Sequence, residues 1–344
     1  MSLSVDIEKR LGNFKLKVNF ETENETLALF GASGCGKSMT LRCIAGIEKP
    51  DRGRIVLGDK VLFDSEKRIN LSPQKRHVGY LFQQYALFPN MTVEQNIACG
   101  IHKHKDPEKI AEMIKTMHLE GMEKKRPDQL SGGQQQRTAL ARILIGDPDI
   151  LMLDEPFSAL DTHLRYEMEL EVRQVIKRFG KPVILVSHDR DEVYRISDRI
   201  AVMKNGAIEF MNDKVSVFMN PQTINGAILT GYDNISRIKV LGPGRVYAID
   251  WQCELDVDGD TQGITHIGAR TKSFEIGGDE NAFQCKVTEI VNNAFSNIVH
   301  AAPENAVQGK SFAIHASENI KDIKVADTIT VSLPKDRIAL IRED

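Results

Sequence analysis

The sequence predicts an α/β domain followed by a smaller all-β domain, and two observations lead to this prediction. Over the first two-thirds of the chain, short unbroken apolar runs alternate with helical patterns, as in a sheet whose strands are buried on both faces. After about Asn225 the runs become short and alternating, with glycine-rich turns between them. We therefore expect one domain at 1–225 and a second domain, a barrel or a sandwich, at 226–344.

Each predicted element of the first domain rests on a local pattern. The apolar runs at 26–30, 150–153 and 183–186 read as buried strands, and 78–82 is a fourth strand-like run. Between them, apolar residues recur at helical spacing in 107–125, which indicates a helical subdomain at about 85–150. In the second domain the alternating runs 245–249, 311–315 and 328–333 predict strands.

Composition and charge narrow the class of protein. The 344 residues can form two domains, and the formal net charge is −3. The segment after Asn225 has 12 basic and 17 acidic residues, which argues against nucleic-acid binding through contacts to phosphates. The sequence shows no apolar run of about 18 residues and no secretory signal pattern. Its 5 cysteines are widely spaced, so we expect reduced thiols in a cytosolic protein and no zinc site.

A phosphate-binding loop lies between the first buried strand and a helix, and it fits the pattern G-x-x-x-x-G-K-[ST]. Its residues are Gly31, Ala32, Ser33, Gly34, Cys35, Gly36, Lys37 and Ser38. Glycines let backbone N–H groups converge on phosphates, and the helix directs its positive end to the same place. We expect Lys37 to contact the β- and γ-phosphates and Ser38 to bind Mg²⁺. The lysine and the helix start also predict a reactive thiolate at Cys35.

Polar residues follow the other predicted strands. Asp154 and Glu155 end the run 150–153, and beside a phosphate loop they suit Mg²⁺ binding and water activation respectively. His188 follows the run 183–187, at the edge where ligands of α/β sheets bind, although a lone histidine there is often a surface residue. Gln83 follows the run 78–82, and its amide is a candidate for Mg²⁺ or the attacking water.

A second helix start is built to bind an anion. Ser131 is a good N-cap residue, and the glycines after it leave backbone N–H groups bare. The motif consists of Leu130, Ser131, Gly132, Gly133 and Gln134. The chain has one phosphate loop, so the simplest ligand for this second site is the γ-phosphate held by another copy. The sequence therefore predicts a homodimer.

These motifs together resemble the ATPase subunit of ATP-binding cassette (ABC) transporters. Six family motifs occur in family order over 1–225, the D-loop of 158–161 included. The resemblance implies that Glu155 is the catalytic base, that His188 contacts the γ-phosphate and that Asp161 communicates across the dimer. It also implies a P-loop ABC ATPase domain with a helical subdomain, followed by a small all-β (OB/MOP-like barrel) regulatory domain, with Mg²⁺ and ATP as cofactors.

Within the family the chain is most similar to importer ATPases, and among these to the molybdate type. The segments that carry this second resemblance are 9–14, 69–80 and the single small β domain. The resemblance implies membrane permease subunits as partners, an extracytoplasmic substrate-binding protein acting indirectly, no nucleic acid, and a place at the cytoplasmic face of the membrane. The alternatives are import of tungstate, sulfate, polyamine, iron or sugar, or a soluble ABC ATPase outside transport. We expect the permease to dock at 85–89, whose apolar residues lie beside Gln83.

Two assignments stay open. The family usually stacks adenine on an aromatic residue, but Leu11 occupies that place here, and Phe14 is the alternative. In the second domain, a polar stretch could bind an oxyanion through precise hydrogen bonds, or its asparagines could simply form turns. The residues of this stretch are Asn292, Asn293, Ser296 and Asn297.

Overall fold

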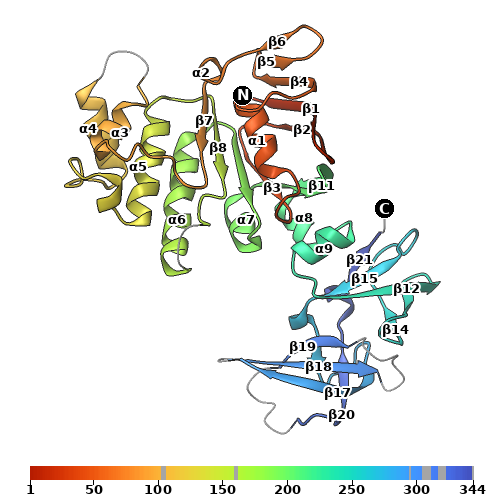
Figure 1. The fold of residues 1–344 in the computed structure, drawn as a ribbon. Coiled ribbons are helices and arrows are strands. Elements are labelled where there is room, and N and C mark those ends of the chain that lie inside the picture. Colours follow the sequence, from red (N-terminus) through yellow and green to blue (C-terminus); the bar gives the residue numbers. More distant parts are fainter. Residues whose placement is uncertain (102–105, 159–161, 294–295, 304–310, 317–322, 343–344) are drawn as a thin grey trace. The chain divides into compact units, whose positions relative to one another are not determined.

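A computed structural model describes residues 1–101, 106–158, 162–293, 296–303, 311–316 and 323–342, and the chain divides into two compact units, 1–214 and 215–344 (Figure 1). The division lies eleven residues before the predicted boundary at 225. Two short helices, α8 (Lys214–Met219) and α9 (Ile224–Leu229), explain the difference. The Tyr232 hydroxyl donates hydrogen bonds to the carbonyls of Phe218 and Met219, and Ala227 packs with Tyr232, so both helices belong with the second unit.

The strands described in unit 1 form one mixed sheet with the order β6-β5-β4-β1-β2-β11-β10-β3-β9-β8-β7. They are β1 (Leu3–Leu11), β2 (Phe14–Thr22), β3 (Thr26–Phe30), β4 (Arg52–Leu57), β5 (Lys60–Asp64), β6 (Ile69–Asn70), β7 (Val78–Leu81), β8 (Ile150–Asp154), β9 (Val183–Ser187), β10 (Arg199–Lys204) and β11 (Ala207–Asp213). The runs expected to be buried on both faces, β3, β8 and β9, are buried at every position.

The functional edge of this sheet is set by four parallel strands. β7 pairs in parallel with β8, β8 with β9, and β9 with β3. Their carboxyl ends therefore meet at one edge, where ligands of open α/β sheets bind. The phosphate loop follows β3, while Gln83, Glu155 and His188 follow β7, β8 and β9. Pairing of the strands thus gathers four segments that are far apart in the sequence.

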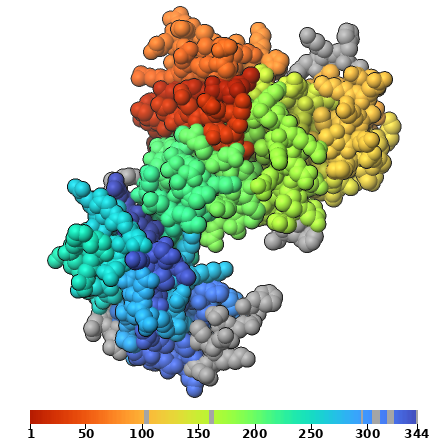
Figure 2. Space-filling view, turned by 180° about the vertical axis from the view of Figure 1, so that it is seen from behind, coloured from red at the N-terminus to blue at the C-terminus, as the bar shows by residue number. Residues whose placement is uncertain are grey.

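The helices of unit 1 cover the sheet and build a separate helical part. They are α1 (Lys37–Ala45), α2 (Pro73–Arg76), α3 (Val93–Ala98), α4 (Pro107–Thr116), α5 (Gly132–Leu144), α6 (Thr162–Phe179) and α7 (Arg190–Ile196). The helices α3, α4 and α5 lie in the stretch predicted as a helical subdomain. Figure 2 shows this part, in yellow, at the opposite side of unit 1 from the red and orange N-terminal strands.

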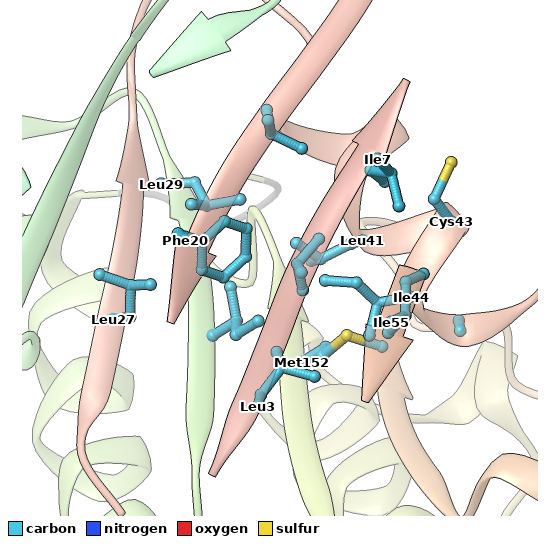
Figure 3. Close-up of a cluster of buried hydrophobic side chains, with 14 of the residues drawn as sticks. Leu3, Ile7, Phe20, Leu27, Leu29, Leu41, Cys43, Ile44, Ile55 and Met152 are labelled. Atoms are coloured by element: carbon cyan, nitrogen blue, oxygen red, sulfur yellow. The ribbon is translucent and has the colours of Figure 1, made fainter. Parts of the chain in front are cut away.

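The core of unit 1 lies where α1 packs between the parallel and antiparallel strands (Figure 3). Leu41 and Ile44 of α1 meet Leu3 and Ile55 from the antiparallel strands and Met152 from β8. Each of these side chains is 0% exposed. Burying one such side chain stabilises the fold by about 1.5–3 kcal/mol, so this cluster anchors the helix that carries the phosphate loop.

Unit 2 is built from two antiparallel sheets, with the orders β14-β13-β12-β15-β21 and β16-β20-β17-β18-β19 within the described residues. The strands are β12 (Asn234–Gly242), β13 (Arg245–Ala248), β14 (Cys253–Asp256), β15 (His266–Ala269), β16 (Glu275–Ile276), β17 (Phe283–Asn292), β18 (Asn297–Pro303), β19 (Phe312–Ala316), β20 (Thr328–Ser332) and β21 (Ala339–Ile341). Trp251, Phe274 and Phe312 fill the space between them, with ring centroids 4.9–6.1 Å apart. The strands of unit 2 thus form a small, nearly barrel-shaped all-β body.

A buried arginine ties α1 to the strand that leads to Gln83. Arg76, at the end of α2, is 0% exposed. Its guanidinium donates to the carbonyls of Cys43 and Ile44 at the end of α1, to the Leu71 carbonyl and to Asn70 Oδ1, at 2.7–2.9 Å. The negative end of the helix dipole favours a cation at this place. Burial nevertheless lowers the pKa of Arg76, which shows that the charge is costly to enclose.

Replacing Arg76 by leucine should destabilise unit 1, because the Ile44 and Leu71 carbonyls and the Asn70 amide oxygen lose the Arg76 donor inside the protein. We expect the free energy of unfolding to fall by about 3 kcal/mol or more. Urea unfolding followed by circular dichroism measures this loss. The single tryptophan, Trp251, lies in unit 2, so its fluorescence transition provides an internal control that Arg76→Leu should leave unchanged. Equal shifts of both transitions would contradict a role confined to unit 1.

Candidate nucleotide site

The phosphate loop adopts a backbone that glycine permits. Gly34 has a φ of 80° and Gly36 a φ of 110°, both in the left-handed region. A Cβ on Gly31 would lie 2.5 Å from the Met203 carbonyl oxygen, so the strand and the loop approach too closely for a side chain. Helix α1 begins at Lys37 and carries no acidic side chain in its first turn. Its positive end is therefore available to an anion.

Backbone carbonyls of the loop hold the Lys37 side chain. The residue is 4% exposed, and its Nζ donates to the carbonyls of Gly31 and Ala32 at 2.8 and 2.9 Å. Within the described residues its hydrogen-bond partners are uncharged, because the third is the Cys35 thiol at 3.9 Å. A buried ammonium group that lacks a carboxylate has strong electrostatic attraction for phosphate oxygens.

The same geometry corrects the prediction for Cys35. Cys35 is 7% exposed, and this burial raises the pKa of the thiol, although the Lys37 ammonium opposes the change. The expectation of a reactive thiolate is therefore wrong: the sequence showed the lysine but not the burial. Cys99 is the cysteine that the structure places on the surface.

Ser38 and Asp154 form a pair of oxygen ligands at the start of α1. The Ser38 hydroxyl donates to Asp154 Oδ1 at 2.7 Å, and Asp154 is 5% exposed. One carboxylate, one hydroxyl and the phosphates of a substrate are the donor set that Mg²⁺ uses in ATPases, so these residues fit a magnesium ion. The Tyr80 hydroxyl donates to the other oxygen of Asp154, a contact that the sequence reasoning missed.

Glu155 gathers the predicted catalytic residues around itself. Its backbone has a φ of 46°, an uncommon conformation for a residue with a side chain, and its N–H bonds to the Val186 carbonyl. Glu155 Oε1 lies 3.2 Å from His188 Nδ1, and Oε2 accepts a hydrogen bond from Gln83 Nε2 at 3.2 Å. Three residues from three strand ends thus meet at one carboxylate. The amide nitrogen of Gln83 points to Glu155, and its role as a magnesium ligand stays a prediction.

A small cavity of about 70 Å³ adjoins Glu155 and His188. A single water needs only about 10–15 Å³ of such volume, so the cavity has room for water beside the carboxylate. Its lining includes residues that the sequence reasoning did not select. The lining residues are Glu155, Ser158, Arg165, Ser187, His188, Asp189 and Glu192.

Glu192 is the unusual member of this lining. It is 4% exposed and accepts a hydrogen bond of 2.6 Å from the Ser187 hydroxyl, next to His188. Burial raises the pKa of Glu192 to about 7, with Asp189 and Glu169 adding to the rise, whereas Ser187 and Arg165 oppose it. The nearby charges are paired: Arg165 lies 3.6 Å from Asp189, and Arg195 lies 2.6 Å from Glu169. Its place in the first turn of a helix gave no sign of this in the sequence.

The segment predicted to bind a second anion begins a capped helix. Ser131 caps α5, and a reciprocal pair of hydrogen bonds joins it to Gln134: Ser131 Oγ accepts from the Gln134 N–H, and Gln134 Oε1 accepts from the Ser131 N–H. Ser131 is exposed, whereas Gly133 is buried against Met168. The described side-chain hydrogen bonds of Ser131 and Gln134 stay within the start of α5. Asp161, predicted to act across the dimer, lies outside the described residues.

Two open assignments acquire structural context. Phe14 lies beside the phosphate loop, because a Cβ on Gly36 would come within 3.2 Å of its ring, whereas Leu11 is 38% exposed.

The polar stretch of unit 2 is the turn of the β17–β18 hairpin, with Asn292 paired to Asn297 and the Asn293 N–H bonded to the Ser296 carbonyl. This pairing favours the turn interpretation over an oxyanion site, although 294–295 lie outside the described residues.

Fold and site together define a P-loop ATPase. Residues 13–158 match the family model described as ABC transporter. The chain is 34% identical over 342 residues to a spermidine/putrescine import ATP-binding protein of Clostridioides difficile, covering 97% of this chain and 94% of that protein. It is 36% identical over 295 residues to an Fe(3+) ions import ATP-binding protein of Fusobacterium nucleatum, covering 82% and 77%. The chain therefore belongs to the ABC transporter family of ATP-binding proteins.

Solved structures agree with this assignment. A dimeric post-hydrolysis state of the ATP-binding cassette MJ0796 with ADP and Pi has a TM-score of 0.53 and 28% identity, covering 62% of this chain and 99% of that one. The cbiO1 protein of Clostridium perfringens, part of an ABC transporter complex, has a TM-score of 0.55 and 29% identity, covering 63% and 90%. The predicted fold class is confirmed. The molybdate subfamily is not supported, because the Clostridioides and Fusobacterium relatives are named for other cargo.

The raised pKa of Glu192 predicts a specific pH dependence of stability. The folded protein holds this proton more tightly than the unfolded chain, whose carboxyl has a pKa near 4.5. The contribution of Glu192 to stability should therefore fall as the pH rises from about 4.5 to about 7. Glu192→Gln should remove this loss. Between about pH 4.5 and 7, the free energy of unfolding of the variant should therefore rise relative to that of the wild type by about 1.4 kcal/mol per pH unit. Urea unfolding at several pH values measures the difference. The exposed Glu108→Gln variant should follow the wild type, and a Glu192→Gln curve parallel to the wild type would contradict the assignment.

Proposed function

We propose that this chain is the ATP-hydrolysing subunit of an ABC importer and works as a pair of copies bound to a separate membrane permease. The observation that carries the proposal is the meeting of four strand ends: the phosphate loop, Asp154, Glu155 with Gln83, and His188 lie at one edge of the sheet. Nucleotide hydrolysis needs these parts together, and a structural protein does not.

The chemistry follows from the positions of these groups. Lys37 and the N–H groups at the start of α1 bind the phosphates, and a magnesium ion held at Ser38 and Asp154 would neutralise charge that develops on them. Glu155 accepts the proton of the attacking water, for which the adjoining cavity has room. Gln83 and His188 hold the two oxygens of this carboxylate in place before substrate arrives. In the ATP-bound dimer we expect His188 to reach the γ-phosphate.

The second half of each site comes from the partner copy. Ser131, Gly132, Gly133 and Gln134 form a capped helix start whose first residue, Ser131, is exposed. A second copy facing this surface would supply the nucleotide. The related cassette whose structure is described as dimeric supports this arrangement. Asp161 is proposed to link the two sites.

The permease is proposed to dock in a groove beside Gln83. The groove has a volume of about 350 Å³, and its lining includes Ile47 and Phe82, which are 45% and 37% exposed. Phe88 is 46% exposed, and its ring centroid lies 5.4 Å from the Arg142 guanidinium. The same guanidinium donates hydrogen bonds to the carbonyls of Tyr85 and Ala86 and so holds this segment. Tyr85, predicted as part of the docking surface, is instead buried and bonds to the Pro156 carbonyl. No described helix is long and apolar enough to cross a membrane.

The cargo is proposed to be a polyamine or ferric iron rather than molybdate. The supporting observation is the naming of relatives: the match over 97% of this chain is to a spermidine/putrescine importer subunit, and the Fe(3+) relative covers 82%. The ATPase need not touch the cargo, so this inference rests on kinship and carries no contact argument. We place the protein at the cytoplasmic face of the membrane, with an extracytoplasmic binding protein as an indirect partner and without nucleic acid.

Glu155→Gln should keep ATP binding and lose hydrolysis, because the amide cannot accept the proton. Loss of a general base costs about 10²–10⁴-fold in rate. The variant should therefore accumulate as an ATP-bound dimer on gel filtration. Adding Ser131→Arg to the same chain should abolish this dimer while each copy still binds ATP through its own Lys37. A Glu155→Gln variant that hydrolyses ATP at the normal rate would overturn the role of Glu155, and a dimer that survives Ser131→Arg would overturn the composite site.

The cargo is tested by uptake in cells that lack the gene. Radiolabelled spermidine, ferric iron and molybdate are offered separately, and the gene is restored as wild type or as the inactive Glu155→Gln variant. We expect one of the first two uptakes to depend on the wild-type gene. Dependence of molybdate uptake alone would refute the proposed cargo but leave the ATPase function standing.

A further inference from the structure

The Asp154 carboxylate is held at both of its oxygens. Oδ1 accepts the Ser38 hydroxyl at 2.7 Å, and Oδ2 accepts the Tyr80 hydroxyl at 2.7 Å. Asp154 is 5% exposed and Tyr80 is 9% exposed, so both hydrogen bonds lie largely out of water. The first bond joins two residues of known motifs. The second comes from a strand residue that none of the six motifs includes.

Strand pairing explains how Tyr80 reaches this carboxylate. β7 and β8 are parallel neighbours, and Tyr80 is opposite Met152. Alternation along β8 places Asp154 on the same face as Met152, two residues nearer the edge. The length of a tyrosine side chain covers this offset, and phenylalanine at the same position would have the ring without a donor. A leucine or valine would fall short of the carboxylate.

The Tyr80 ring is itself fixed. It packs against Phe82 with ring centroids 4.4 Å apart and an interplanar angle of 47°, and it belongs to the buried cluster of unit 1. The hydroxyl therefore has little freedom to leave the carboxylate. A tyrosine hydroxyl carries a proton near neutral pH, so the phenol of Tyr80 is the donor in this bond.

We propose that Tyr80 is a positioning residue that aims the Asp154 carboxylate at Ser38 and so prepares it for the magnesium ion of MgATP. The two oxygens of a carboxylate are rigidly linked, so a bond that fixes Oδ2 also fixes the direction of Oδ1. Without the phenol, a buried carboxylate oxygen lacks a donor, and the group gains by turning toward other donors. The proposal rests on the proposed ATPase function and deepens it at one carboxylate.

The test compares nucleotide affinity in EDTA with affinity in excess magnesium, using a fluorescent ATP analogue and the full chain. The phosphate loop is intact in Tyr80→Phe, so its affinity in EDTA should equal that of the wild type. The gain in affinity that magnesium brings should fall by about tenfold, since a hydrogen bond to a charged group is worth about that much. Tyr80→Met, which fills similar space without the ring, should show the same loss.

Tyr232→Phe is the matched control, because it also removes a buried tyrosine hydroxyl but does so in unit 2. Both variants can have a lower melting temperature without nucleotide. Only Tyr80→Phe should lose the gain in nucleotide affinity that magnesium brings. An unchanged magnesium effect in Tyr80→Phe and Tyr80→Met overturns the proposal, as does an equal loss of affinity with and without the metal. A wild-type chain that binds nucleotide without any response to magnesium would instead refute the ATPase function itself.

Discussion

Parallel pairing of β7, β8, β9 and β3 is the constraint on which the rest of unit 1 depends. Each of these strands is followed by a segment that carries a functional group, and parallel pairing brings all four carboxyl ends to one edge. The same pairing sets finer contacts, because Tyr80 reaches Asp154 only in the register that puts it opposite Met152. A shift by one residue would turn Tyr80 to the other face of the sheet.

The site also depends on buried charges that neutral groups stabilise. Lys37 is held by backbone carbonyls, Arg76 by carbonyls at the end of α1, and Asp154 by two hydroxyls. Lys37 and Asp154 face the nucleotide position without a charged partner among their described contacts, so their charges remain available to phosphate and metal. Arg76 instead serves the fold, since it joins the two ends of the segment between α1 and β7.

Unit 2 shows a different organisation. Its aromatic core and antiparallel sheets form an all-β body, and α9 packs with this body through Ala227, Tyr232 and Ile341. None of the groups placed at the nucleotide site comes from it. The polar stretch at Asn292 and Asn297 proves to be part of a hairpin within that body.

The sequence by itself determined the class of protein and the fold class, and it predicted the residues of the nucleotide site, because the phosphate loop and the strand-end carboxylates are local patterns with fixed spacing. Tertiary structure decided what depends on burial and on contacts between distant segments. Cys35 looked activated in sequence, but its burial raises the pKa of the thiol. Tyr85 looked like surface and is in the interior. Tyr80 finds its hydrogen-bond partner on another strand, and burial raises the pKa of Glu192. The boundary between the units lies before the predicted one because α8 and α9 belong with the later strands. A linear pattern records neighbours along the chain, whereas burial and pKa depend on neighbours in space.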